Sequence, residues 1–366
     1  MVHEQILGGW LEGPSQQITP GQMLPQGTGS HPAIVMTISR VRPWLAAGAL
    51  CLVSAVAGAA SGPAPRQAMS DALFTGPLAA PNATALPKGH WDIEPYLIDS
   101  IQYASFDDDW SQTDVKDSHA LRSVTLMQYG LTDRLSIALL PTFGYNIPAD
   151  GSTSSGPQLG DMTVRAHYML HKFTEGEPWP TFSLSYAQGF PTGKYDGLEG
   201  NTADGLGSGV LESTFGIFTQ TYFWMPTGRI LRTRLNATYT TAFDDASVSG
   251  VSVYGTPAGF EGQIDTGDSY AVNLAFEYSL TRHWVPAVDI IYSHSDGAAI
   301  RGVQAANGLS TPIRSTSGSS ELVSIAPALE YNWNGHYGLI VGADVVVAGR
   351  NTAATVTPQA ALNIYY

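Results

Sequence analysis

Charged and polar side chains recur at every second position in many segments of this chain, with apolar residues between them. An alternation of period two is typical of β-strands, whose successive side chains point to opposite faces. One face of the expected strands therefore carries acids, bases and amides that could select or bind ions. This polar set comprises Asp92, Glu94, Arg165, His167, His171, Arg232, Arg234, Asn236, Glu277, Asp289, Glu330 and Asp344.

The spacing of these residues does not favour a metal site or a catalytic centre. His167 and His171 share a face, but four residues of strand separate them by about 13 Å, which is too far for one metal ion. His294, Ser295 and Asp296 have the residue types of a hydrolytic triad, yet consecutive residues cannot form its relay. We therefore expect no catalytic residue, no metal and no cofactor.

Two further clusters have structural explanations that we favour. The glycine-rich residues 205–209 lack the strand-to-helix context of a phosphate-binding loop. The acidic residues 107–117 have ligand types suited to Ca²⁺, or to divalent ions that bridge lipopolysaccharide, but solvated charge is the favoured interpretation.

The elements that position the polar set are antiparallel strands. In residues 121–145 two alternating runs flank a short polar turn at residues 130–134, which predicts a hairpin. The alternation continues over residues 89–366 in roughly twelve strands, many about ten residues long, as a tilted strand needs to cross a bilayer. Short turns alternate with long loops, which include residues 244–268 and the segment that ends at Ser319.

Aromatic residues gather beside the short turns, as expected for a ring at the membrane interface. Because every backbone group in hydrocarbon must be paired, such a sheet has to close into a barrel whose first and final strands join. A secreted sandwich or propeller is the alternative. The expected interface aromatics are Trp91, Tyr129, Trp179, Trp224, Tyr278, Trp284, Trp333 and Tyr366.

Closure assigns the polar set to the interior, because charges at this density are costly towards lipid. Two interpretations stay open: a pore lining whose mixed signs set selectivity, or a packed lumen in which acids and bases pair. Arg232 and Arg234 are the best candidates to contact an anion, although pairing with an acid on a neighbouring strand is favoured.

Composition narrows the class of protein. Of 366 residues only 13% are charged, and the formal net charge is −14. This charge argues against a nucleic-acid partner, since phosphate binding needs a cationic surface. Beyond residue 60 no run of about twenty apolar residues exists that could form a membrane-spanning helix.

The first 88 residues divide into three predicted parts. Residues 1–35 read as a mis-started or disordered leader. Residues 36–60 read as a signal peptide, with an uncleaved N-terminal helix as the alternative. Residues 61–88 read as a flexible periplasmic lead-in. The single cysteine, Cys51, lies in the predicted signal, so the mature chain would have no thiol.

Short motifs occur at residues 129–137, Pro141, 160–162, Tyr168, 190–196 and 205–209. They resemble motifs of the outer-membrane family named for the meta-pathway of phenol degradation. These motifs mark turns and loop bases rather than a reactive centre. The resemblance covers most of residues 89–366 and implies a transporter or channel linked to the uptake of aromatic or hydrophobic compounds.

We therefore predict an all-β, closed antiparallel barrel of about twelve strands over residues 89–366, in the outer membrane of a Gram-negative bacterium. The predicted function is a channel or transporter for small solutes, aromatic or hydrophobic ones among them. The alternative is a closed barrel that acts through its extracellular loops, and an outer-membrane hydrolase is less favoured. Expected partners are outer-membrane lipid, lipopolysaccharide, a small solute, and the barrel-assembly machinery through the C-terminal strand.

Overall fold

The computed structural model describes residues 64–306 and 308–366, and almost all of the regular structure there is β-strand. The predicted leader and signal peptide, with Cys51, lie outside the described residues. Two single-turn 3₁₀ helices lie outside the strands: η1 (Met69–Asp71) precedes β1, and η2 (Thr202–Asp204) lies between β7 and β8. No helix in the described part of the chain is long and apolar enough to span a membrane.

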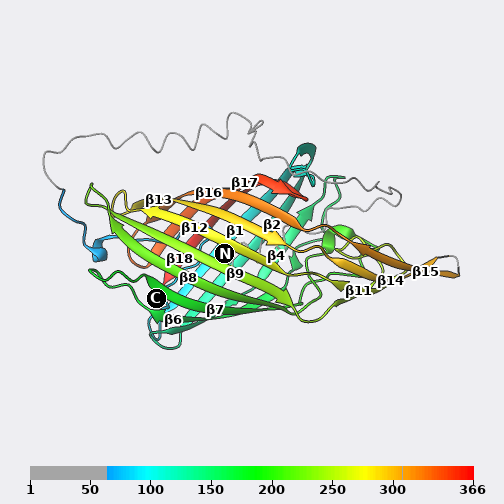
Figure 1. Ribbon diagram of the computed structural model, residues 1–366, viewed down its shortest axis with the longest axis horizontal. Coiled ribbons are helices and arrows are strands. Elements are labelled where there is room, and N and C mark those ends of the chain that lie inside the picture. The colour runs from blue at the N-terminus through cyan, green and yellow to red at the C-terminus, as the bar shows by residue number, and fades with distance from the viewer. Residues whose placement is uncertain (1–63, 307) are drawn as a thin grey trace, which may run out of the picture.

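A closed antiparallel barrel of 12 strands forms the body of the molecule (Figure 1), which confirms the predicted fold class. One barrel strand is split at Pro141 into β3 and β4, and the two-residue β5 pairs with β4. In chain order the elements of this sheet are β1 (Trp91–Phe106), β2 (Gln112–Gly130), β3 (Leu135–Leu140), β4 (Thr142–Ile147), β5 (Gln158–Leu159), β6 (Met162–His171), β7 (Thr181–Phe190), β8 (Glu212–Trp224), β9 (Ile230–Ala242), β12 (Ser269–Tyr278), β13 (Trp284–Ser295), β16 (Ser320–Asn332), β17 (Tyr337–Arg350) and β18 (Thr352–Tyr365).

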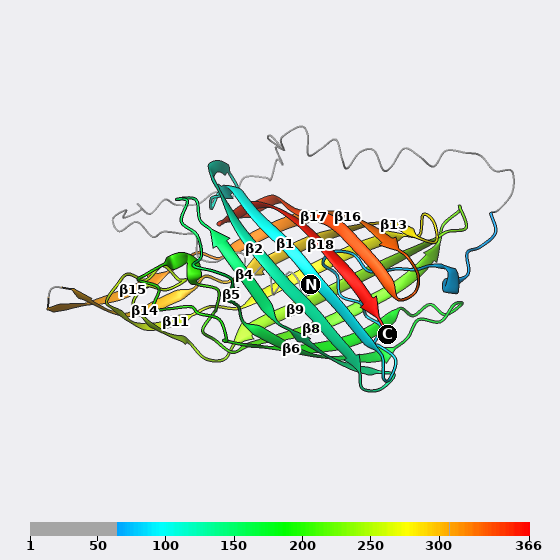
Figure 2. The same cartoon turned by 180° about the vertical axis from the view of Figure 1, so that it is seen from behind.

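The first and last strands join, as barrel closure requires. Strand β1 pairs with β18 along its length, and the two lie side by side in Figure 2. At the short-turn end the Trp91 amide donates to the Tyr366 carbonyl at 2.8 Å, and the Tyr366 amide donates back at 2.9 Å. The barrel therefore has no free edge, which satisfies backbone groups that lipid could not.

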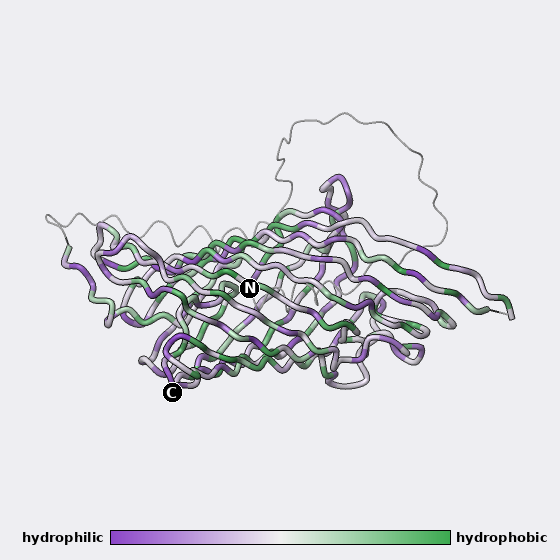
Figure 3. The backbone as a smooth tube through the Cα atoms, turned by 60° about the horizontal axis from the view of Figure 1, so that its bottom comes forward, coloured by the Kyte–Doolittle hydropathy of each residue, from purple (hydrophilic) through white to green (hydrophobic). Residues whose placement is uncertain are grey.

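Side-chain alternation follows the pleat around the barrel. On β6 the side chains of Arg165 and His167 are buried inside, whereas Val164 and Tyr168 are exposed outside. Figure 3 shows hydrophobic residues along the strands with less hydrophobic ones between them. Because the outer wall is apolar and the barrel is closed, the protein resides in the outer membrane of a Gram-negative bacterium.

Two of the predicted long loops contain strands instead, which corrects the sequence prediction. A second, four-stranded sheet projects beyond the barrel at the end opposite η1 (Figure 1). Its core includes Phe260 and Ile264, both fully buried. The prediction missed this sheet because its apolar runs are short and glycine-rich. Its strands are β10 (Ala246–Ser249), β11 (Phe260–Asp265), β14 (Ala299–Ala306) and β15 (Leu309–Thr316).

Candidate functional site: a lumen filled by the chain's own N-terminal segment

The segment that precedes β1 lies inside the barrel. It enters beside the β8–β9 turn, where the Gln67 amide donates to the Gly228 carbonyl at 2.8 Å. It leaves beside the β2–β3 turn, where the Gly89 amide donates to the Gly130 carbonyl at 2.8 Å. Between these points residues 73–86 occupy the lumen, and we call them the plug segment. The predicted flexible lead-in over residues 61–88 is therefore wrong for the part described.

Carboxylates on the barrel wall hold amide groups of the plug segment. The two oxygens of Asp289 accept from the Ala79 amide at 3.3 Å and the Ala80 amide at 2.9 Å. Glu330 accepts from the Thr75 amide at 2.6 Å. These hydrogen bonds tie the plug segment to the barrel wall, so the two acids act as anchors.

Cationic and amide side chains hold the carbonyls of the same segment. Arg234 donates to the Ala80 carbonyl at 2.5 Å, and Asn236 donates to the Pro81 carbonyl at 3.0 Å. The His167 Nε2 lies 3.1 Å from the Ala83 carbonyl oxygen.

The plug segment is thus held mainly through its backbone, which explains its composition. Residues 73–86 are rich in alanine and proline, whose short side chains leave the main chain accessible to the wall. Leu78 and Phe74 are exceptions. Leu78 packs fully buried against inward-facing apolar residues that include Tyr96, Leu140 and Ile291, and the Phe74 ring packs against wall side chains. In the sequence this segment shows mainly small residues without a periodic hydrophobic pattern, a composition that indicates a flexible segment.

An ion cluster on β9 and β12 accounts for the two adjacent arginines. Arg232 makes a bidentate contact with Glu277, in which its Nε donates at 2.6 Å. The Arg234 Nε lies 3.3 Å from the same carboxylate, which is completely buried. The guanidinium of Arg232 also stacks over the Phe74 ring at 4.3 Å. Both arginines therefore pair with an acid on the neighbouring strand. The sequence favoured this pairing over contact with a free anion.

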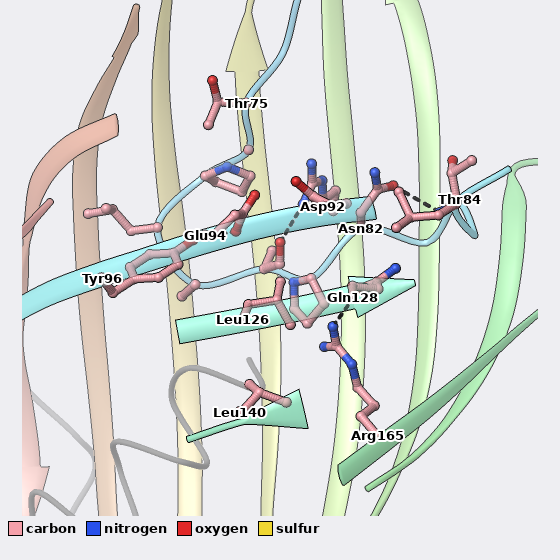
Figure 4. Close-up of a pocket in the computed structure, with 18 residues that line it drawn as sticks. Thr75, Asn82, Thr84, Asp92, Glu94, Tyr96, Leu126, Gln128, Leu140 and Arg165 are labelled. Carbon is pink, nitrogen blue, oxygen red and sulfur yellow. Dashed lines mark hydrogen bonds between the residues drawn. The ribbon is translucent and has the colours of Figure 1, made fainter. Parts of the chain in front are cut away.

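A second polar group lies where β1 meets β2 and β18. Asn363 donates to Asp92 at 2.8 Å and to Glu94 at 2.6 Å, and Arg165 donates to Gln128 at 2.9 Å. Asp92, Glu94, Gln128 and Arg165, together with residues of the plug segment, line a cavity of about 90 Å³ (Figure 4). A cavity of this volume has room for only a few water molecules.

Two members of the predicted polar set lie apart from these clusters. His171 sits at the end of β6, where its Nδ1 contacts the Pro180 carbonyl at 2.9 Å and its side chain is 41% exposed. Asp344 lies half-buried on β17. No group of three or more metal-ligating side chains occurs in the part of the chain that the structure describes.

Seven of the eight predicted interface aromatics belong to the outer wall or its short-turn rim, and Trp91 packs on Tyr129 at 4.7 Å. Trp224 is a correction: its neighbour Phe223 faces outward, and its indole nitrogen donates to the Gln67 carbonyl at 2.9 Å. The Arg66 guanidinium lies over the Trp224 ring, 4.1 Å from the ring centroid. Trp224 therefore secures the entering segment. The other outer aromatics are Trp179, Tyr278, Trp284, Trp333 and Tyr366.

The opposite mouth is organised by Asp161, within one of the motifs that carry the family resemblance. Its carboxylate accepts from the Gly193 amide at 2.7 Å and from the Ser208 hydroxyl at 2.7 Å, so it ties down the loop between β7 and β8. Burial raises the pKa of Asp161 to about 6 despite these hydrogen bonds.

Two histidine–acid pairs bear on the hydrolase alternative. His119 contacts Asp99 at 3.0 Å, and His294 contacts Asp296 at 3.3 Å. Among the described residues, neither imidazole is hydrogen-bonded to a serine, threonine or tyrosine hydroxyl.

Comparison with known proteins bears on the fold. No family model matches the sequence, and no curated protein matches it. Among solved structures, the COG4313 outer membrane channel from Pseudomonas putida F1 superposes with a TM-score of 0.59 at 15% identity, over 79% of this chain and 100% of that one. The KdgM porin matches with a TM-score of 0.37 at 8% identity, over 74% of this chain and 98% of that one. The Pseudomonas putida toluene transporter TodX matches with a TM-score of 0.33 at 11% identity, over 76% and 89%. By fold this chain is an outer-membrane β-barrel similar to the first of these structures.

Proposed function

We propose that this protein is an outer-membrane channel or transporter for small solutes, which pass when the plug segment leaves or rearranges in the lumen. The observation that carries the proposal is that wall side chains hold the plug segment by reversible hydrogen bonds to its backbone. With the segment in place, the cavity beside it has a volume of about 90 Å³, so the segment occupies space through which a solute would have to pass.

The inner wall supports solutes that combine apolar and polar parts. Buried apolar side chains around Leu78 form one inward patch, and the Arg232–Glu277 cluster lies elsewhere on the same wall. Removal of the plug segment would expose both. The resemblance of the turn motifs to the phenol-degradation family points to aromatic or hydrophobic compounds as the solute class.

Planar-bilayer conductance and liposome flux test this proposal. We expect low conductance from the full chain and severalfold higher conductance after deletion of residues 73–86. Deletion of residues 299–316, which lie outside the barrel, is the matched control and should leave conductance unchanged. Equal conductance of the plug deletion and the full chain, in protein shown to be folded, would refute the channel.

A second candidate is a closed barrel that acts through its extracellular part. The filled lumen and the projecting second sheet favour it. Loss of a cellular phenotype on deletion of residues 299–316, with unchanged permeability and no conductance from the plug deletion, would support this alternative.

Two further steps belong to the proposal. The predicted signal at residues 36–60 would export the chain. The barrel-assembly machinery would then engage β18 and the C-terminal residue after it, where Leu362, Ile364 and Tyr366 alternate as in a terminal barrel strand.

A further inference from the structure

The inner wall holds one residue of the plug segment by both of its backbone polar groups. The Ala80 amide donates to Asp289 at 2.9 Å, and the Ala80 carbonyl accepts from Arg234. Asp289 on β13 and Arg234 on β9 are both register partners of the buried Ala275 on β12, so these three residues form one row across the wall. Neighbouring strands lie about 4.8 Å apart, so about 10 Å separates the two outer backbones of the row. The row therefore forms a site for the backbone of a single small residue.

Asp289 is completely buried and lacks a cationic partner in the described chain. Its hydrogen-bond donors are neutral: the amides of Ala79 and Ala80, and the Asn273 side chain at 3.1 Å. No arginine, lysine or histidine among the described residues forms an ion pair with Asp289, whereas Glu277 pairs with two arginines. Because buried carboxylates are normally paired, this one is suited to a ligand that brings a positive charge.

A buried acceptor beside Asp289 is also unused. The side-chain oxygen of Asn273 has no hydrogen-bond partner among the described residues, although Asn273 is completely buried. The nitrogen of the same amide group donates to Asp289, so this oxygen lies beside the carboxylate. A backbone amide has one N–H donor, whereas an ammonium group has three. An α-ammonium in place of the Ala80 amide would therefore supply donors for Asp289 and Asn273 together.

The other end of the row is suited to a neutral carbonyl. Arg234 and its neighbour Arg232 interact with two carboxylates, Glu277 and Glu330. These guanidinium groups need no anionic ligand, and Arg234 donates to an uncharged carbonyl of the plug segment. Asn236, two residues further along β9, donates to the next carbonyl at 3.0 Å. The row thus matches a positive group at one end and uncharged peptide carbonyls at the other.

We propose that the row of Asp289, Ala275 and Arg234 binds the N-terminal residue of short peptides, with the α-ammonium on Asp289 and the first peptide carbonyl on Arg234. The plug segment occupies the same site with a neutral amide in place of the ammonium. The first residue of the ligand is small, because the Ala80 side chain that it replaces is itself buried. This inference rests on the proposed channel function, since a solute reaches the site only when the plug segment moves.

Saturation-transfer NMR on the purified full chain in detergent tests the proposal at pH 7, where the α-amino group of a peptide is protonated. One probe is alanyl-proline amide, which copies residues 80–81 with a free ammonium. The other is N-acetylalanyl-proline amide, which copies them without the charge. Each is titrated to about 10 mM, above the millimolar effective concentration of a tethered competitor such as the plug segment. The plug weakens both peptides equally and cancels from the ratio of their affinities.

We expect the peptide with the free ammonium to bind about tenfold more tightly, because a charge-assisted hydrogen bond is stronger than a neutral one. Asp289→Asn removes the negative charge and keeps an acceptor oxygen, so it should reduce the ratio of the two affinities to about one, even though it loosens the plug. Asp99→Asn, on the outward-facing side of β1, is the matched control and should keep the wild-type ratio.

Three results would overturn the proposal. The first is equal binding, or no binding, of the two peptides by the wild type, a comparison that needs no variant. The second is a ratio that Asp289→Asn leaves unchanged. The third is competition by ammonium chloride as strong as that by the free peptide, which would indicate a simple cation site.

The conductance of the plug deletion separates this inference from the channel itself. Raised conductance of the deletion, in a protein that shows no preference for the free ammonium, would refute the peptide site alone. A clear preference for the free ammonium without any conductance would refute the channel and support the peptide site.

Discussion

Substitution of Asp289 by alanine should release the plug segment. Its carboxylate accepts two backbone amides, from Ala79 and Ala80, and it is completely buried. A hydrogen bond to a charged group contributes about 1.5–3 kcal/mol, and water can enter the space left by the side chain, so the lower value applies. Two lost bonds then amount to about 3 kcal/mol, or roughly a hundredfold shift towards the displaced plug.

Single-channel recording measures this shift directly as the fraction of time in a high-conductance state. Asp289→Asn keeps one acceptor oxygen and should give an intermediate open fraction. Asp108→Ala, in the exposed tip of the β1–β2 hairpin, is the control and should behave as the wild type. An unchanged open fraction in folded Asp289→Ala protein, or an equal increase in the control, would refute the idea that this carboxylate latches the plug.

Three further predictions concern stability, pH and the entry point. Glu277→Gln leaves two buried guanidinium groups without their counter-charge, so it should lower the free energy of unfolding in urea by about 3–5 kcal/mol. The pKa of Asp161 is raised from 3.8 to about 6 in the folded protein, so its carboxyl is protonated at pH 5. Above pH 6 the buried carboxyl ionises, and this lowers the stability of the folded loop relative to pH 5. Proteolysis of the loop at residues 191–211 should therefore be faster at pH 7.5 than at pH 5, and Asp161→Asn should remove this difference. Trp224→Ala should raise basal conductance because it frees the entering segment, whereas Trp179→Ala should not; equal effects would argue against an inward role for Trp224.

The barrel could be predicted from the sequence because its signal is local and repeated. Period-two alternation in segments such as Ser269–Tyr278 identifies strands, and alternating short and long connections give their order. The pairing of Arg232 with an acid on a neighbouring strand followed from the same reasoning, because a strand face fixes which residues share the interior.

The contents of the lumen could not be predicted in this way. Ala80 meets Arg234 and Asp289, which lie 154 and 209 positions further along the chain, and these contacts use the backbone of Ala80 rather than its side chain. Such contacts impose no periodic pattern on residues 73–86. Trp224 was assigned to the outer ring because it lies beside a turn, although its parity along β8 places it inside.

The route of the plug segment also bears on how the barrel is built. The segment enters beside Gly228, in the β8–β9 turn, and leaves beside Gly130, the last residue of β2, at the same end of the barrel. It forms a loop that dips into the cylinder without passing through it, so insertion needs no gap between β1 and β18. The wall can be completed in the membrane first, and the loop can move in or out afterwards while every interstrand hydrogen bond stays intact.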